Sequence, residues 1–309
     1  MKVTLRLAAL AAAVAAPLAA EGAPLFIATF DNASSSSQFN VTQVAGSADT
    51  VAFGYDYSAH AIPEAPSSPG GAAATRGLFL QANKPAPGGA GANNGINVTA
   101  ASGGVSINFT QLIRARFDMW INIPAGETVG TTEQALFGIN TDGAGVNSRT
   151  GATQTGADGA WYHLAGEGGY GGTSTAANSR DLVGYLNNAV PAGARLDNNE
   201  APLPTLFPSP PAPLLGTPGN KWVQVVIEEE GSNVVMSLDG VDIFTFSNTA
   251  SGSGSVFVGY QDPFSGSVGS TGLFAIFDNV VVEVVPEPSS LLLGAGCFAA
   301  ALVRRRSTR

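Results

Sequence analysis

The chain has 309 residues, of which 39 are glycine, 19 are proline and only 12% are charged. This length allows one large domain or two small ones, and the many turn-forming residues favour β structure. Six of the 14 basic residues lie within six positions of a chain end, so 8 basic and 23 acidic residues lie between the ends. This excess of negative charge argues against a nucleic-acid partner. The single cysteine, Cys297, lies near the C-terminus, so the body should contain no disulfide and no thiolate metal site.

The N-terminus has the pattern of a secretory signal peptide. Lys2 and Arg6 precede an apolar stretch, which Pro17 ends. Small residues around Ala20 and Gly22 fit a cleavage site. We therefore assign residues 1–22 to a signal peptide and expect the remainder to be exported.

The body of the chain predicts a succession of β-strands with no convincing amphipathic helix. The clearest strand covers residues 112–123, where apolar side chains such as Phe117 alternate with polar ones such as Arg114 and Arg116. Such alternation predicts a sheet with one buried and one solvated face. A loop is expected at 34–37. The other expected strands are 25–30, 51–57, 77–82, 95–99, 105–109, 134–140, 161–164, 180–186, 221–229, 233–238, 241–246, 256–260 and 273–285.

Two local signals organise the second half of the body. Asp239 and Gly240 separate two alternating apolar runs, which predicts a tight hairpin. Before it, seven prolines fall within residues 202–218. This tract is either an interdomain linker or a loop packed on the domain. The interleaved Leu203 and Phe207 need burial, so we favour the packed loop.

Eleven to thirteen strands joined by loops of mixed length predict an all-β, antiparallel two-sheet sandwich over residues 23–285. Residues 221–285 carry a Trp-bearing strand, Ser-Leu-Asp-Gly-Val-Asp at 237–242, Val-Gly-Tyr at 258–260 and Phe-Asp-Asn-Val-Val-Val at 277–282. This segment resembles the concanavalin A-like jelly rolls of laminin-G and legume-lectin type. The resemblance implies a jelly-roll topology and no particular activity.

The last 24 residues form a three-part tail: Pro286, Glu287 and Pro288, then an apolar run at 291–303, then Arg304, Arg305 and Arg306. As a helix, the apolar run reaches about 20 Å, which is short of a hydrocarbon core of about 30 Å. The flanking arginines should stay on the cytoplasmic side of a membrane. A docked C-terminal helix is the alternative, but this run is apolar all round.

The tail resembles the PEP-CTERM sorting signal of Gram-negative bacteria. The resemblance implies that residues 286–309 hold the protein in the inner membrane until an exosortase-type protease removes them. The body would then reach the cell surface or an extracellular polysaccharide matrix. Residues 25–285 also look like a group of exported PEP-CTERM proteins, through Tyr-Asp-Tyr-Ser at Tyr55, Thr-Arg-Gly-Leu at Thr75 and Gly-Tyr-Gln-Asp-Pro-Phe at Gly259.

The sequence offers no catalytic motif. Glu-x-Asp-x-x-Glu, the string that places glycosidase carboxylates in one cleft, is absent, as are Gly-x-Ser-x-Gly and His-Glu-x-x-His. The adjacent acids at 228–230 should alternate between faces of a strand. His60 and His163 each stand alone in the sequence. We assign no catalytic residue and expect no enzyme activity.

Calcium and glycans are the ligands that we consider for the body. Calcium prefers carboxylate and carbonyl oxygens in loops; by residue type the candidates are Asp31, Asn32, Asp142, Asp262 and Asp278. Asp31 and Asp278 lead this group because the first and last strands pair in the family resembled, although ordinary roles in turns and at strand edges are the favoured explanation of all five. Candidate rings for stacking on sugars are Trp120, Trp161, Tyr162 and Tyr170. Trp120 falls on the polar face of its strand, so either a glycan or a covering layer of protein would account for it.

Three functions therefore stay open. The leading hypothesis is a non-catalytic exported protein with a structural or interaction role, because both ends carry sorting signals and catalytic strings are absent. The second is a lectin-like glycan-binding module, with or without calcium. The third, a hydrolase acting on polysaccharide, has only the analogy of fold behind it.

Overall fold

The computed structural model describes residues 23–45, 49–71, 74–82, 94–125, 133–150, 153–155, 158–168, 181–187, 189–209, 214–247, 253–263 and 272–285. Residues Ala23–Val285 form one compact unit. The expected signal peptide, the sorting tail with its Pro-Glu-Pro box and arginines, and Tyr170 all lie outside the described residues. Within the described ranges, no helix has the length and apolar character needed to cross a membrane.

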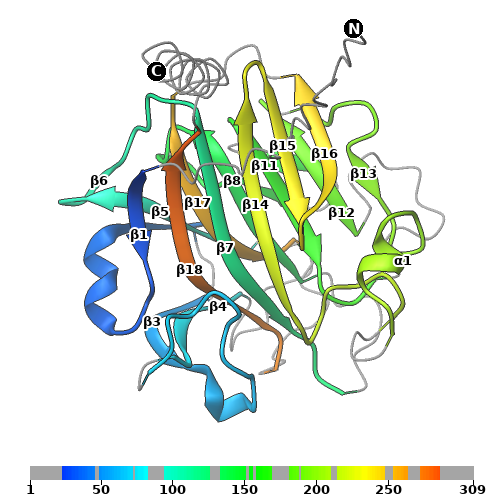
Figure 1. The fold of residues 1–309 in the computed structure, drawn as a ribbon, viewed down its shortest axis with the longest axis horizontal. Coiled ribbons are helices and arrows are strands. Elements are labelled where there is room, and N and C mark those ends of the chain that lie inside the picture. Colours follow the sequence, from blue (N-terminus) through cyan, green and yellow to red (C-terminus); the bar gives the residue numbers. More distant parts are fainter. Residues whose placement is uncertain are drawn as a thin grey trace, which may run out of the picture. The chain divides into compact units, whose positions relative to one another are not determined.

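The first large sheet, sheet A, has the strand order β16-β15-β14-β7-β18-β4-β3, and β1 also pairs with β18 (Figure 1). Its strands are β1 Pro24–Ala28, β3 Thr50–Asp56, β4 Arg76–Gln81, β7 Ile113–Asn122, β14 Trp222–Glu230, β15 Asn233–Leu238, β16 Val241–Ser247 and β18 Phe274–Val284. All of its pairs are antiparallel.

The second large sheet, sheet B, has the order β13-β12-β11-β8-β17-β5-β2, with β6 paired to β5. Its strands are β2 Phe39–Gln43, β5 Asn94–Ser102, β6 Val105–Ser106, β8 Gln134–Thr141, β11 Ala160–Ala165, β12 Leu182–Leu186, β13 Arg195–Leu196 and β17 Ser255–Asp262. These pairs are antiparallel as well. Because β8 and β17 run in opposite directions, the end of β8 meets the start of β17.

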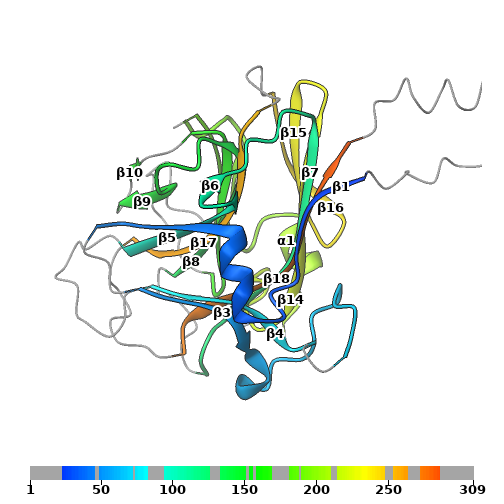
Figure 2. The same ribbon diagram turned by 90° about the vertical axis from the view of Figure 1, so that its left-hand side faces the viewer.

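The two sheets pack face to face, as the side view shows (Figure 2). Phe117 of β7 meets Phe137 of β8 across the interior, with ring centroids 5.6 Å apart. The alternating apolar side chains of β7 are all buried there, while Arg114 and Arg116 face outward. The predicted antiparallel two-sheet sandwich is confirmed, and so is the predicted division of β7 into a core face and a polar face.

The smaller elements correct several local expectations. A two-stranded sheet of β9 Ser148–Thr150 and β10 Thr153–Thr155 belongs to neither large sheet. The sequence did not predict β2, β9, β10 or β13, which are short or polar. The expected loop at 34–37 lies within a 3-10 helix, η1 Ala33–Gln38, and a second one, η2, covers Tyr57–His60.

The proline tract packs on the domain, as expected. It contains the short helix α1 Leu203–Leu206, and the side chains of Leu203 and Phe207 are buried in the main core. The hairpin at Asp239 and Gly240 is also confirmed. Both residues have positive φ, 48° and 77°, which is the signature of the turn that matches the twist of β15 and β16.

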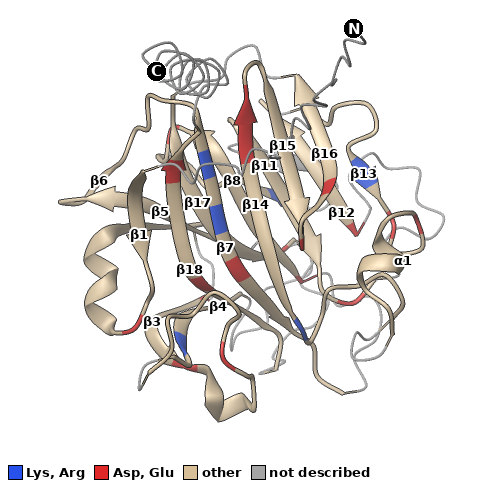
Figure 3. Ribbon diagram, in the orientation of Figure 1, with Lys and Arg blue, Asp and Glu red and all other residues tan. Residues whose placement is uncertain are grey.

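The outer face of sheet A is divided into two parts. Towards one end it carries a charge ladder (Figure 3) in which Arg114 bonds Glu228 at 2.6 Å and Glu283 at 3.3 Å. Towards the other end, aromatic side chains such as Trp120 and Trp222 pack into a small second core. The segment from 57 to 71 lies against this core: Trp222 Nε1 donates to Pro63 O at 2.8 Å.

Candidate functional site

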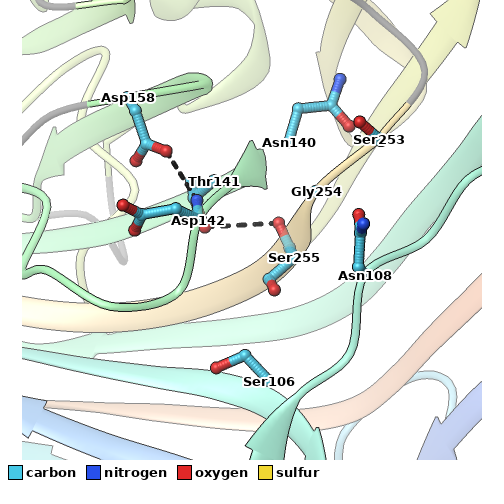
Figure 4. Close-up of a pocket in the computed structure, with 9 residues that line it drawn as sticks. All are labelled: Ser106, Asn108, Asn140, Thr141, Asp142, Asp158, Ser253, Gly254 and Ser255. Carbon is cyan, nitrogen blue, oxygen red and sulfur yellow. Dashed lines mark hydrogen bonds between the residues drawn. The ribbon is translucent and has the colours of Figure 1, made fainter.

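A polar cleft of about 400 Å³ opens at the end of sheet B where β8 stops and β17 begins (Figure 4). Its lining residues are Ser106, Asn108, Asn140, Thr141, Asp142, Asp158, Ser253, Gly254 and Ser255. Apart from the glycine, every lining side chain carries a hydroxyl, an amide or a carboxylate. Two carboxylates and no cationic group lie in the lining, so the cleft suits a neutral or positively charged ligand.

Asn140 is held at the cleft from the interior of the sandwich. It has a φ of +59°, so β8 turns sharply at this residue. Its Nδ2 donates to Glu229 Oε1 at 2.8 Å, and Glu229 Oε2 accepts the main-chain N–H of Ile113 at 3.0 Å. Because the carboxylate of buried Glu229 can only accept, it fixes the amide of Asn140 with Nδ2 towards sheet A. The Oδ1 atom of Asn140 therefore faces away from that carboxylate.

Two glycines allow the chain to pass close to Asn140. A Cβ atom on Gly159 would lie 2.5 Å from the carbonyl oxygen of Asn140, and one on Gly254 would lie 2.3 Å from its Cα. Both glycines also have positive φ, a region that side-chain-bearing residues rarely adopt. These glycines let three separate segments converge on the end of β8.

The two carboxylates of the cleft lie next to each other. The main-chain N–H of Asp142 donates to Asp158 Oδ2 at 2.6 Å, and that of Ala144 donates to Asp142 Oδ1 at 2.8 Å. Burial raises the pKa of Asp158, and the negative charge of Asp142 raises it further, against the lowering effect of the hydrogen bond from Asp142. The pair therefore forms a concentrated acceptor region on one wall of the cleft.

Two oxygen atoms of the cleft residues have no hydrogen-bond donor. Asp158 Oδ1 and Asn140 Oδ1 are both shielded from solvent, and among the described residues neither receives a hydrogen bond. Leaving a buried acceptor without a donor costs about 1–3 kcal/mol. A ligand that brings hydroxyl or ammonium donors, or a metal ion, would recover this cost.

The cleft contains two carboxylates and two amides, which are ligand types that calcium accepts. Of the calcium candidates, Asp142 alone lines the cleft. The described part of the chain contains no group of three or more His, Cys, Asp or Glu side chains placed to hold a metal. A ligand with hydroxyl donors also fits the lining.

The two leading calcium candidates lie elsewhere in the fold. β1 and β18 do pair, as the resemblance implied. However, Asp278 is buried opposite Asp118, and burial raises its pKa to about 8, with Asp118 and Asp31 contributing further. Asp31 accepts a hydrogen bond from Thr29 at 2.5 Å. This environment favours a protonated carboxyl at Asp278.

The remaining calcium candidates have local structural roles or are enclosed. Asn32 caps η1 by accepting from the main-chain N–H of Ser34 at 2.9 Å. Asp262 is fully buried at the end of β17.

The expectation that Trp161 and Tyr162 are exposed is wrong. Both are fully buried, because sheet B is covered on its outer face as well as its inner face. Tyr162 stacks on Phe137 inside the sandwich at 5.7 Å, while Trp161 stacks on Tyr185 at 3.9 Å on the outer face. Neither ring offers an open platform to a sugar.

Trp120 packs against Trp222, with ring centroids 5.7 Å apart, and is partly buried. The covering layer that we considered as an alternative therefore accounts for this tryptophan on a polar face.

The single histidines pair with tyrosines. His60 Nε2 lies 2.7 Å from the hydroxyl of Tyr55, and buried His163 Nδ1 lies 2.9 Å from the hydroxyl of Tyr185. The expected alternation of the acids at the end of β14 holds, since Glu228 joins the outer charge ladder and Glu229 points into the interior.

Sequence reasoning identified one cleft residue, Asp142, and missed the others. Asn140 and Asp158 lie in turn-rich stretches where Asn and Asp are expected for conformational reasons alone. The run Asn-Thr-Asp-Gly at 140–143 marks the end of a strand, but nothing in it indicates which distant segments meet there.

Comparison with known proteins gives no family assignment. No protein-family model matches the chain, and no curated protein matches it. Among solved structures, it is similar to a protein of unknown function with a galectin-like fold from Bacillus subtilis, at 11% identity over 85% of this chain and 96% of that one, with a TM-score of 0.45. It is also similar to the exoplasmic domain of VIP36 in a Ca²⁺- and mannose-bound form, at 8% identity over 69% and 80% of the chains and a TM-score of 0.41.

A third similar structure is the carbohydrate-binding module CBM66 from Bacillus subtilis, at 14% identity over 67% of this chain and 86% of that one, with a TM-score of 0.34. All three identities are below 15% and all three TM-scores are below 0.5. The chemistry of the cleft, rather than these similarities, therefore has to support any functional proposal.

Proposed function

We propose that this protein is a non-catalytic, exported β-sandwich that binds neutral glycans through the polar cleft at the end of β8. The observation that carries the proposal is the pair of buried acceptors, Asp158 Oδ1 and Asn140 Oδ1, in a lining made of hydroxyls, amides and carboxylates. A sugar presents several hydroxyl groups, and each of them can donate as well as accept. A sugar hydroxyl is therefore a neutral group able to satisfy these oxygens.

Charge supports a neutral ligand over an anionic one. The cleft contains Asp142 and Asp158 and no Lys or Arg, and the chain as a whole has a formal net charge of −9. A carboxylated or sulfated glycan would meet repulsion both at long range and at the contact surface. The volume of about 400 Å³ falls at the lower end of the range usual for small-molecule sites, so it suits one or two sugar rings.

The binding test compares neutral and acidic oligosaccharides on a glycan array, followed by calorimetry on the neutral sugars that bind. Replacing Asp158 with Asn removes one acceptor oxygen and should weaken binding about tenfold, the effect of losing a hydrogen bond to a charged group. Glu230→Gln is the control, because it makes the same change of charge at an exposed strand end. Absence of binding to every neutral sugar would refute the proposal.

Two further arms separate the alternatives. Titration with calcium and with a chelator tests whether the cleft takes a metal, and sugar affinity that is the same in both supports a site without calcium. Incubation with the sugars that bind tests for catalysis, and shortened products would show that the protein is an enzyme after all.

The exported destination is supported by the Pro-Glu-Pro box and the basic end of the chain. Sorting to the cell surface or polysaccharide matrix, with an exosortase-type protease as processing partner and a transient inner-membrane stage, follows from that resemblance. The test is localisation of the protein with and without residues 286–309. Unchanged processing and location after the deletion would refute the sorting role of the tail.

A further inference from the structure

Several hydroxyl groups that line the cleft face a ligand as acceptors. Ser255 Oγ donates to the carbonyl oxygen of Ile107 at 2.8 Å, and Ser106 Oγ donates to that of Gly143 at 3.2 Å. Thr141 Oγ1 points to the carbonyl oxygen of Ser255 at 3.4 Å (Figure 4). A hydroxyl has only one hydrogen, so these three groups offer a ligand lone pairs rather than hydrogens.

The two carboxylates of the cleft are also only partly used. Each has one oxygen bound to a main-chain N–H: Asp158 Oδ2 accepts from Asp142 at 2.6 Å, and Asp142 Oδ1 accepts from Ala144 at 2.8 Å. The second oxygen of Asp158 is shielded from solvent and receives no hydrogen bond from the described residues. Asp142 is exposed, so its second oxygen is open to a ligand. Figure 4 shows both side chains on the same side of the cleft.

The lining of the cleft supplies no positive charge to balance this pair, since it contains neither lysine nor arginine. Burial raises the pKa of Asp158, and the negative charge of Asp142 raises it further. Two like charges held next to each other repel, and a cation bound between them would replace the repulsion by attraction. A ligand that brings a positive charge would therefore complete the cleft.

Among the groups that a sugar can carry, a protonated amino group fits these observations. An ammonium group has three hydrogens to donate, no lone pair with which to accept, and a positive charge. Its hydrogen bonds to carboxylates are about twice as strong as those between neutral groups. An N-acetylated amine fits less well, because it is neutral and its carbonyl oxygen would meet the acceptors of the lining.

We infer that the glycan bound by the cleft carries a protonated amino group, as a 2-amino-2-deoxy sugar does, and that Asp142 and Asp158 bind this group. The inference rests on the proposed function and narrows its ligand class: among sugars with the same ring, the amino sugar binds more tightly than its neutral counterpart. The attraction between unit charges about 4 Å apart is worth about fivefold in affinity even in water, so two carboxylates should give the amino sugar an advantage of at least about tenfold.

The experiment is calorimetry on the full-length protein in detergent, at about pH 6, where an amino group is charged, and with a chelator present so that no calcium occupies the carboxylates. The probes are matched sets with one ring: glucose, glucosamine and N-acetylglucosamine, and the corresponding sets for galactose and mannose. We expect the amino sugar of the preferred set to bind at least about tenfold more tightly than the neutral sugar, and N-acetylation to remove that gain. The gain should also shrink between about 0.05 M and about 0.5 M salt, because exposed charges are screened.

The outcomes separate the inference from the proposed function. Amino sugars that bind no more tightly than their neutral counterparts would overturn the inference and leave the proposed function standing. No binding of any sugar would overturn both. Binding of amino sugars alone would support the inference and refute the neutral ligand of the proposed function.

Removing the charges of the pair tests which groups bind the amine. Asp142→Asn and Asp158→Asn each keep the main-chain hydrogen bond of the residue replaced, through the amide oxygen. Each should lower the preference for the amino sugar about threefold or more, and the double variant should bind the amino and neutral sugars equally. Glu64→Gln is the control, because it removes one exposed negative charge in the segment from 57 to 71 and should leave the preference unchanged.

A double variant that keeps its Tm and the full preference would show that other groups bind the amine, and the inference would be wrong. Should the double variant fail to fold, full preference in both single variants has the same meaning.

Discussion

The carboxyl group of Asp278 should carry a proton in the folded protein at neutral pH. The oxygen of Tyr57 lies 2.8 Å from Ala74 O and 3.2 Å from Asp278 Oδ2, and it accepts the main-chain N–H of Ala65 at 3.2 Å. The phenol has one hydrogen, which it can donate to Ala74 O or to Asp278 Oδ2. A protonated Asp278 lets both contacts be hydrogen bonds at once, because the carboxyl then donates to the phenol oxygen while the phenol donates to Ala74 O.

The electrostatic surroundings favour the same protonation state. Burial raises the pKa of Asp278 to about 8, and the neighbouring carboxylates of Asp118 and Asp31 add to the effect, against the lowering effects of the hydrogen bonds from Asn279 and Tyr57. Burial and Asp278 also raise the pKa of Tyr57, which stays protonated. Asp118 accepts hydrogen bonds from the main-chain N–H and the hydroxyl of Ser67 and from Asn279 Nδ2.

This shift sets the sign and size of a pH effect on stability. In the unfolded chain an aspartate titrates near pH 4, so between about pH 4 and pH 8 the folded protein holds one proton more than the unfolded one. The free energy of unfolding therefore falls as pH rises through that window. Relative to acid pH, the destabilisation caused by Asp278 reaches about 5–6 kcal/mol above pH 8 and about 4 kcal/mol at pH 7, both as upper limits.

The test is Asp278→Asn, followed by urea unfolding of the protein and the variant from pH 5 to pH 9. An asparagine can donate to Tyr57 and accept from the main-chain N–H of Asn279, but it does not titrate. We expect the variant to gain stability over the wild type steadily between pH 5 and pH 8, with no further gain above. A difference that is flat with pH, or a variant that is less stable at every pH, would refute a protonated Asp278.

Three further predictions concern the cleft and the body. Glu229→Ala should cost about 2–4 kcal/mol in urea unfolding, because it leaves the main-chain N–H of Ile113 buried without an acceptor, whereas Glu230→Ala should stay within about 0.5 kcal/mol. Gly159→Ala should lower the free energy of unfolding by about 1–3 kcal/mol more than Gly193→Ala, because Gly193 has a similar φ but open space around it. Equal losses would show that the close contact with Asn140 can relax. A fragment of residues 219–285 should be unfolded, since β14 and β18 both pair with β7 outside it; a well-dispersed NMR spectrum from the fragment would contradict this.

The sequence could predict which face points to the core for strands that have one apolar and one polar face. β7 and β14 alternate apolar and polar side chains, and β15 and β16 meet at an Asp-Gly turn whose geometry follows from its residues. In each case a local pattern matches the local environment. The same reasoning predicted the packed proline tract, because Leu203 and Phe207 had to be buried somewhere.

Strands covered on both faces, such as β8 and β17, were predicted, but their burial was not, and strands without apolar residues were missed. Ala160–Ala165 has the sequence AWYHLA, and periodicity cannot tell that both sides are enclosed, so Trp161 and Tyr162 looked exposed. β9 and β10, with the sequences SRT and TQT, give no hydrophobic signal at all.

The cleft could not be predicted because its walls come from separate segments, around Ser106, Asn140, Asp158 and Ser255, that meet through the register of β8 with β17. The preference for Asp31 and Asp278 came from the correct pairing of β1 with β18. Pairing alone gave no information about burial, and burial is what raises the pKa of Asp278 to about 8.

The pairing of β1 with β18 also brings the two ends of the body together. Val284 N lies 3.3 Å from Ala23 O, so the body starts and finishes at one point on its edge. Such a body can be circularly permuted, because a short peptide joining Ala23 to Val285 closes the ring and new ends can be opened at an exposed turn such as Gly231. For the same reason the sandwich can be inserted whole into a surface loop of another protein. Because its two ends lie close together, the insertion would not force the two ends of the host loop apart.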